Sequence, residues 1–153
     1  MRSGTLNTPG IVGLAEALRC CLEEMPNEAD RLCGLRNRLF DGLNDRLDDL
    51  FLNGPPLGRP ELRLPGSLNA CFRNVDGEAL MMSMKDVSVS SGSACTSTDP
   101  TPSHVLRAIG LSDDDTRASL RFSLGRFNTE PEVDFAVESV SEAVERLRKL
   151  NRD

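Results

Sequence analysis

A polar loop around one cysteine is the part of the sequence that offers chemistry most directly. Cys95 stands among small, polar residues in the run SSGSACTSTDP, residues 90–100. A thiol attacks only as the thiolate, so a reactive cysteine needs solvent exposure and nearby positive potential. The loop composition predicts exposure, and His104, Arg107 and the start of the following helix could supply the potential. The residues alone leave two interpretations open, a reactive thiol and an exposed cysteine without function.

The other four of the five cysteines have different surroundings. Cys21 and Cys33 fall within helical apolar patterns and Cys71 within a strand pattern, so we expect these three to be small buried residues. Cys20 has no evident role. The odd count and the absence of CxxC or Cys/His spacing argue against a structural zinc site and against a disulfide framework.

Length and charge limit the class of protein. A chain of 153 residues suits one domain with a real core. Its net charge of −6 argues against nucleic-acid binding, which needs clustered positive charge. It contains no apolar run long enough to span a membrane, and MRSGTLNTPG at the N-terminus lacks the apolar region of a signal peptide. We therefore expect a cytoplasmic protein with no nucleic-acid or membrane partner.

The chain begins with two patterns of helical periodicity. Ile11, Leu14, Leu18, Leu22 and Met25 recur at steps of three and four residues, which predicts a helix over 10–25 that stops at Pro26. A leucine stripe predicts a second helix over 27–50. The two helices would form a bent hairpin or a kinked pair.

The remainder alternates between strands and helices. A loop rich in proline and glycine follows, with at most a short strand at its start. Thr129 and Glu132 form a capping box that opens the last helix. Asp113 to Asp115 is expected to be a solvated turn. The predicted order is strand 67–73, helix 76–86, strand 87–90, helix 101–110, strand 116–124 and helix from 130. This order predicts the α/β class, in an α+β-like form with a small mixed or antiparallel sheet and helices packed on one side.

Several motifs together carry a resemblance to a known family. SSGSACTS, PSHVLRAIGL and SLRFSLGRFNTEPEVD, with MRSGTLN, DRLCGLRNRL and VDGEALMMSMKD in the same order, cover nearly the whole chain. They resemble the C-terminal part of a cysteine desulfurase of the NifS/IscS type, a class-V aminotransferase-like family of fold type I enzymes that depend on pyridoxal phosphate. The cysteine octet is similar to the branch of the family with a long, flexible loop.

The resemblance implies an activity and assigns roles to three residues. The family removes sulfur from L-cysteine, giving L-alanine and an enzyme persulfide that is passed to iron–sulfur scaffold proteins or other sulfur acceptors. By resemblance Cys95 is the nucleophile and sulfur carrier, and it could also be a transient iron–sulfur ligand. Arg121 matches the arginine that binds the substrate carboxylate, a role that suits a guanidinium fork. Thr5 matches a threonine that contacts the cofactor phosphate of a neighbouring subunit, which implies a homodimer.

The chain also departs from the family pattern. The family's cofactor domain, with its Schiff-base lysine, precedes the part that matches, and the only lysines here are Lys85 and Lys149, neither in a cofactor context. Met1 coincides with an internal position of the family, so we expect a C-terminal piece that is inactive alone. Residues 1–26 would link domains, and residues 27–153 would form the small C-terminal domain with the cysteine loop. A stand-alone persulfide relay or interaction module and a truncated remnant remain the alternatives.

Overall fold

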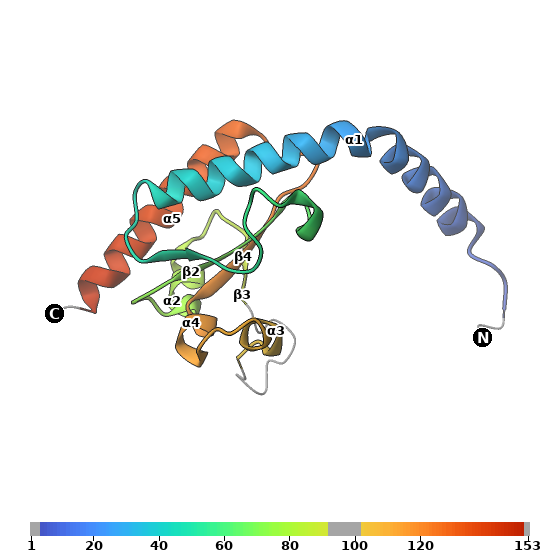
Figure 1. Cartoon of the computed structure of the whole chain (residues 1–153). Coiled ribbons are helices and arrows are strands. Elements are labelled where there is room, and N and C mark those ends of the chain that lie inside the picture. The colour runs from blue at the N-terminus through green and yellow to red at the C-terminus, as the bar shows by residue number, and fades with distance from the viewer. Residues whose placement is uncertain (1–3, 92–101, 152–153) are drawn as a thin grey trace.

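One long helix, α1 (Thr8–Asn44), spans 37 residues near the N-terminus. The computed structural model describes residues 4–91 and 102–151. The helix runs through Pro26, so the predicted stop at this proline is wrong. Proline removes one helical hydrogen bond and clashes with the preceding turn, but neighbouring turns can carry the helix past it with a kink. Figure 1 shows the resulting bend between the dark-blue and light-blue parts of α1. The kinked pair expected from the sequence is therefore one bent helix.

The two parts of α1 have different environments. The part before Pro26 extends away from the rest of the protein, and its apolar stripe lies exposed (Figure 1). The second part buries Leu35, Leu39 and Leu43 against the sheet, as its leucine stripe predicts, but it ends at Asn44 rather than residue 50. The burial expected for Cys21 is wrong, because this thiol lies on the exposed part of the helix.

The sheet contains four antiparallel strands in the order β1–β2–β4–β3. These strands are β1 (Leu50–Leu52), β2 (Ser67–Phe72), β3 (Ser90–Ser91) and β4 (Ser119–Ser123). The sequence predicted a mixed or an antiparallel sheet, and the structure shows the antiparallel form. The strand expected over 87–90 is shorter and lies later, because Val87 and Val89 pack against the core without joining the ladder.

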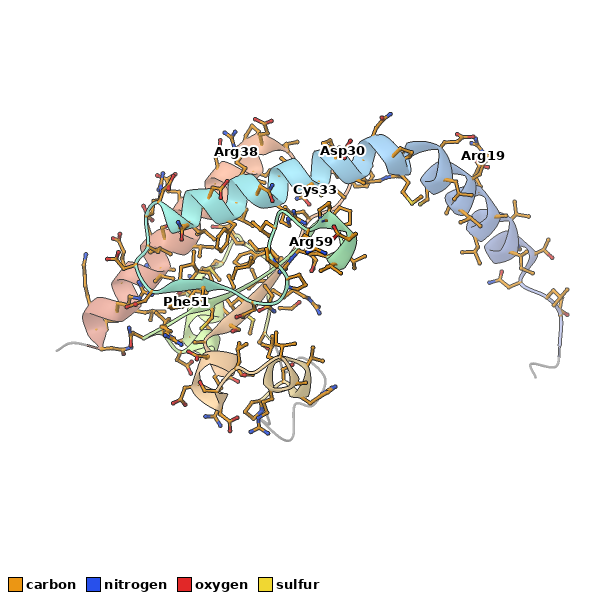
Figure 2. The ribbon with its side chains drawn as sticks, viewed as in Figure 1. Arg19, Asp30, Cys33, Arg38, Phe51 and Arg59 are labelled. Carbon is orange, nitrogen blue, oxygen red and sulfur yellow. The ribbon has the colours of Figure 1, made fainter. Side chains whose placement is uncertain are left out.

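Three helices cover one face of this sheet. The inward residues of β2 and β4 share a core with α1, with α2 (Gly77–Ser83) and with α5 (Glu130–Leu150). The long helices α1 and α5 cross above the sheet in Figure 1. At Gly42 a Cβ atom would lie 2.9 Å from Val137 Cγ2, so glycine permits the close approach of these helices. Arg38 of α1, labelled in Figure 2, adds an ion pair to Asp134 of α5 at 2.6 Å.

The caps of α5 follow the sequence prediction. Thr129 and Glu132 form the reciprocal capping box, with the Thr129 backbone N–H donating to Glu132 Oε2 at 2.9 Å. The Glu132 pKa is lowered chiefly by this backbone N–H, because the hydrogen bond favours the charged carboxylate. The cap fixes where α5 starts and hence which valines face the core.

Two short helices lie where the sequence predicted one longer helix, a turn and the start of a strand. The helix expected over 101–110 is α3 (His104–Ala108), capped by Ser103, and the loop from Gly110 leads to α4 (Asp113–Arg117). The strand expected over 116–124 therefore begins only at Ser119. Asp113 to Asp115 are the first turn of α4 rather than a free turn, a position where carboxylates interact favourably with the helix N-terminus. No helix in the described ranges is long and apolar enough to cross a membrane.

Candidate functional site

A line of polar side chains crosses the sheet on the face opposite the core. Asn69 of β2 pairs in register with Arg121 of β4, and Arg121 pairs with Ser90 of β3. Asn53, just after β1, donates its backbone N–H to the Asn69 carbonyl at 2.9 Å. This bond extends the line to the edge of the sheet formed by β1. Residues directly opposite one another on antiparallel strands project to the same face. These four residues, Asn53, Asn69, Arg121 and Ser90, are called the polar row.

Arg121 is the charged member of the polar row. Its neighbours in β4, Leu120 and Phe122, are buried in the core, so the alternation of the strand turns Arg121 to the open face, where it is exposed. Arg73 and Arg107 each form two hydrogen bonds to an aspartate. Arg121 forms no ion pair or side-chain hydrogen bond within residues 4–91 and 102–151. Its five N–H groups are therefore available to a carboxylate.

A hydrogen-bond chain holds one end of the polar row. Asn53 Nδ2 donates to Asn69 Oδ1 at 2.7 Å and to Ser119 Oγ at 2.9 Å, and Ser119 Oγ donates to the Asp115 carbonyl at 2.6 Å. Asn53 and Ser119 are buried. Buried polar groups that are satisfied in this way are held in one orientation.

Charged contacts between Arg73, just after β2, and α4 border the polar row. Arg73 forms two hydrogen bonds to Asp115, at 2.7 and 3.0 Å, and its guanidinium lies 4.3 Å from the ring centroid of Phe51. Figure 2 places Phe51 on the outer strand β1. The Arg73 hydrogen bonds lower the pKa of Asp115. Burial, with a smaller effect of the Asp115 charge, raises the pKa of Cys71 to about 11, so this thiol stays neutral near pH 7.

Cys95 and the centre of its predicted loop lie outside the described residues. The chain before the loop is fixed by β3, where Ser90 pairs with Arg121 and Ser91 with Leu120. The chain after the loop is fixed by α3, whose Arg107 is joined to Asp113 of α4 by two hydrogen bonds. The loop therefore leaves the sheet from the strand beside Arg121.

The other predicted site residues are not brought into this row. Thr5 is exposed and precedes α1, whose N-terminal end lies away from the sheet (Figure 1). His104 is exposed at the start of α3. Lys85 and Lys149 are exposed as well, on the segment after α2 and near the end of α5. No cluster of three metal-ligating side chains occurs among the residues that the structure describes.

Comparison with known proteins identifies the class and then the nearer relatives. The family model "Aminotransferase class-V" matches residues 1–135, and the chain belongs to this family. It is 51% identical to the cysteine desulfurase IscS of Escherichia coli and 49% identical to that of Aeromonas hydrophila, each over 151 residues. Each match covers 99% of this chain and 36% of the relative, so the chain spans about a third of the length of these relatives.

Solved structures agree with the fold. A NifS-like protein superposes with a TM-score of 0.78 at 31% identity, over 95% of this chain and 36% of that one. A NifS-like protein from Rickettsia africae gives a TM-score of 0.73 at 25% identity, over 94% and 36% of the two chains. These likenesses confirm the predicted fold and family resemblance.

Two members of the polar row, Asn53 and Asn69, were not predicted from the sequence. Asn69 alternates with Leu68 and Ala70, so the strand pattern already predicted that it faces away from the core. Asn53 gave no such signal, because it lies at the start of a loop rich in proline and glycine. Only the register of β1 against β2 reveals that it supports Asn69.

Proposed function

We propose that this chain supplies the sulfur-accepting cysteine and the substrate-carboxylate site of a cysteine desulfurase. In the proposed reaction, L-cysteine and the Cys95 thiol give L-alanine and a Cys95 persulfide. The carbon–sulfur bond of the substrate and the S–H bond of Cys95 break, a sulfur–sulfur bond forms at Cys95, and the released proton completes the methyl group of L-alanine, so atoms and electrons balance. The identity to cysteine desulfurases over 99% of this chain supports the assignment.

The observation that carries the proposal is the pairing of Arg121 with the strand that leads to the cysteine. Ser90 pairs with Arg121, and Cys95 lies four residues after Ser91 in the sequence. A fully extended chain spans at most about 3.6 Å per residue, so the four residues of chain after Ser91 limit the distance between the Ser91 and Cys95 Cα atoms to at most about 14 Å. The short segment between Ser91 and Cys95 would therefore let the thiol reach a substrate bound at Arg121.

Arg121 would hold the substrate by its α-carboxylate. A guanidinium forms two parallel hydrogen bonds to a carboxylate, which fixes both the position and the orientation of the amino acid. Because β4 is bonded on both sides, by β2 and by β3, the arginine backbone has little freedom. The rigid strand would fix the substrate while the loop delivers the thiol.

Pyridoxal phosphate, on which the family depends, does not fit the residues of this chain alone. Its linkage needs a lysine with a depressed pKa, which burial or a cationic neighbour provides. Lys85 and Lys149 are both solvent-exposed, and neither belongs to the polar row. We therefore expect the cofactor lysine to come from outside these 153 residues, and we assign no cofactor step to this chain.

The remaining features of the proposal rest on the family. Thr5 would reach the cofactor phosphate of a neighbouring subunit in a homodimer, and residues 1–26 would connect the small domain, residues 27–153, to the rest of that assembly. The exposed part of α1 is consistent with this division. Iron–sulfur scaffold proteins in the cytoplasm would accept sulfur from Cys95, which could also bind a cluster transiently.

A chimera provides the test. The chain would replace the matching segment of the Escherichia coli relative, and alanine formed from L-cysteine would be measured with a thiol reductant present. We expect activity in the chimera and none in the isolated chain with added pyridoxal phosphate. Cys95→Ser should abolish alanine formation, and Arg121→Ala should lower kcat/KM by about 10- to 100-fold, as the loss of a charged hydrogen-bond pair predicts.

The control is Cys21→Ser, which removes an exposed thiol far from the polar row and should leave the rate unchanged. Full activity of the Cys95→Ser chimera would contradict the proposal. An inactive chimera, together with persulfide transfer to the isolated chain from another protein, would instead support the relay alternative.

A further inference from the structure

We infer that Asn69 is a second ligand for the substrate carboxylate, beside Arg121, and that Asn53 holds its amide in the binding orientation. The inference rests on the proposed function, because it takes the carboxylate at Arg121 as given. It adds an uncharged hydrogen-bond donor beside the guanidinium of Arg121.

The ladder geometry brings Asn69 and Arg121 together. The Phe72 N–H donates to the Ala118 carbonyl, and the Leu124 N–H donates to the Gly66 carbonyl. Hydrogen-bonded and non-hydrogen-bonded pairs alternate along an antiparallel ladder, so the Asn69–Arg121 pair is non-hydrogen-bonded. The side chains of such pairs are the closest across a ladder, with Cβ atoms about 4.5–5.5 Å apart.

The hydrogen-bond chain sets which end of the Asn69 amide is free. The Ser119 hydroxyl donates to the Asp115 carbonyl, and its oxygen accepts from Asn53 Nδ2. The other Nδ2 hydrogen of Asn53 goes to Asn69 Oδ1. Asn69 Oδ1 is therefore the engaged end, and Nδ2 is left as the free donor.

The free donor matches what a carboxylate at Arg121 still requires. A carboxylate offers about four acceptor positions, and a guanidinium fork uses two of them. The two N–H groups of Asn69 Nδ2 form no hydrogen bond with residues 4–91 or 102–151, and this side chain is only half-buried. A carboxylate held by Arg121 can accept one of them from the neighbouring strand. Because Asn53 is buried, it acts on the substrate only through Asn69 and is a positioning residue.

Nuclear magnetic resonance on the isotopically labelled 153-residue chain tests the inference without the cofactor. L-Alanine, which carries the carboxylate and no sulfur, would be titrated while the Arg121 Nε–H and Asn69 Nδ2 signals are followed. L-Alaninamide keeps the ammonium group but lacks the carboxylate, so it serves as the ligand control. We expect both signals to move with the same Kd for L-alanine and neither to move for L-alaninamide.

Variants separate binding from folding. Asn69→Ala should weaken L-alanine binding by about 3- to 10-fold, the effect of one lost hydrogen bond. Asn69→Asp keeps the acceptor for Asn53 and hence the fold, but its charge should repel the carboxylate and abolish binding. Ser123→Ala, on the same face of β4 two residues from Arg121, should leave Kd unchanged. Asn53→Ser should shift the Asn69 Nδ2 signals toward those of a free amide and weaken binding, while the Arg121 signal still responds.

The outcomes distinguish this inference from the proposed function. If the Arg121 signal moves and the Asn69 signals do not, or if Asn69→Asp binds as the parent does, the role of Asn69 is overturned and the Arg121 site stands. If L-alanine moves neither signal, or moves them no more than L-alaninamide does, the carboxylate site at Arg121 is itself overturned.

Discussion

The exposed stripe on the first part of α1 predicts association. Ile11, Leu14, Leu18, Leu22 and Met25 lie on one side of the helix, each with 55% to 73% of its surface exposed. Fully burying such a side chain contributes about 1.5–3 kcal/mol, so covering the exposed part of the stripe would contribute roughly 5–9 kcal/mol. That is comparable with the net stability of a domain, about 5–15 kcal/mol. We expect the isolated chain to self-associate through this stripe.

The assay is sedimentation together with thermal melting over a concentration series. Replacing Leu14 and Leu18 with Gln should remove about 2–4 kcal/mol of apolar burial and weaken association by at least about 30-fold. The Tm of the dissociated chain should not change, because these side chains do not join the core. Leu39→Ala is the matched control: it should cost about 2–5 kcal/mol of unfolding free energy without changing association. A monomer whose Tm is independent of concentration would show that the stripe does not drive association.

Two further predictions concern packing and pH. Gly42→Ala should lower the unfolding free energy by about 1–3 kcal/mol because the new Cβ would meet Val137. Gly34 lies in the same helix, but a Cβ there meets nothing within 4 Å, so Gly34→Ala should raise the unfolding free energy by about 0.5–1 kcal/mol. Equal effects in denaturant titrations would contradict the close helix contact. Because Arg73 lowers the pKa of Asp115 in the folded protein, this pair stabilises above the unfolded pKa and loses its contribution as pH falls below about 4. Asp115→Asn should therefore lose less stability between neutral and acid pH than the parent, and an identical acid profile would contradict this role.

Local signals predicted much of the fold. The capping box at Thr129 located the start of α5, and the alternation in 67–73 and around Phe122 located two strands and their core faces. These predictions succeeded because each depends on residues a few positions apart. The prediction that the helix stops at Pro26 was wrong because the helix continues past the proline with a kink. Whether a proline ends or only kinks a helix depends on the residues around it.

The site was less predictable from the residues. Arg121 could be located on a strand, but its partners in register, Asn69 of β2 and Ser90 of β3, are distant in sequence. Periodicity does not specify which strands pair, so Asn53 could not be connected to Asn69. Asp115 was taken for part of a solvated turn because its partner, Arg73, lies 42 residues away.

The position of the transferred sulfur directly tests whether Cys95 is the sulfur-accepting residue. The chimera would be given L-cysteine labelled with a heavy sulfur isotope, trapped without reductant, digested and analysed by mass spectrometry. We expect the added sulfur on the peptide with Cys95 and none on Cys71, whose pKa of about 11 leaves little thiolate near neutral pH. Labelled sulfur on Cys71, or spread over the cysteines without preference for Cys95, would contradict it.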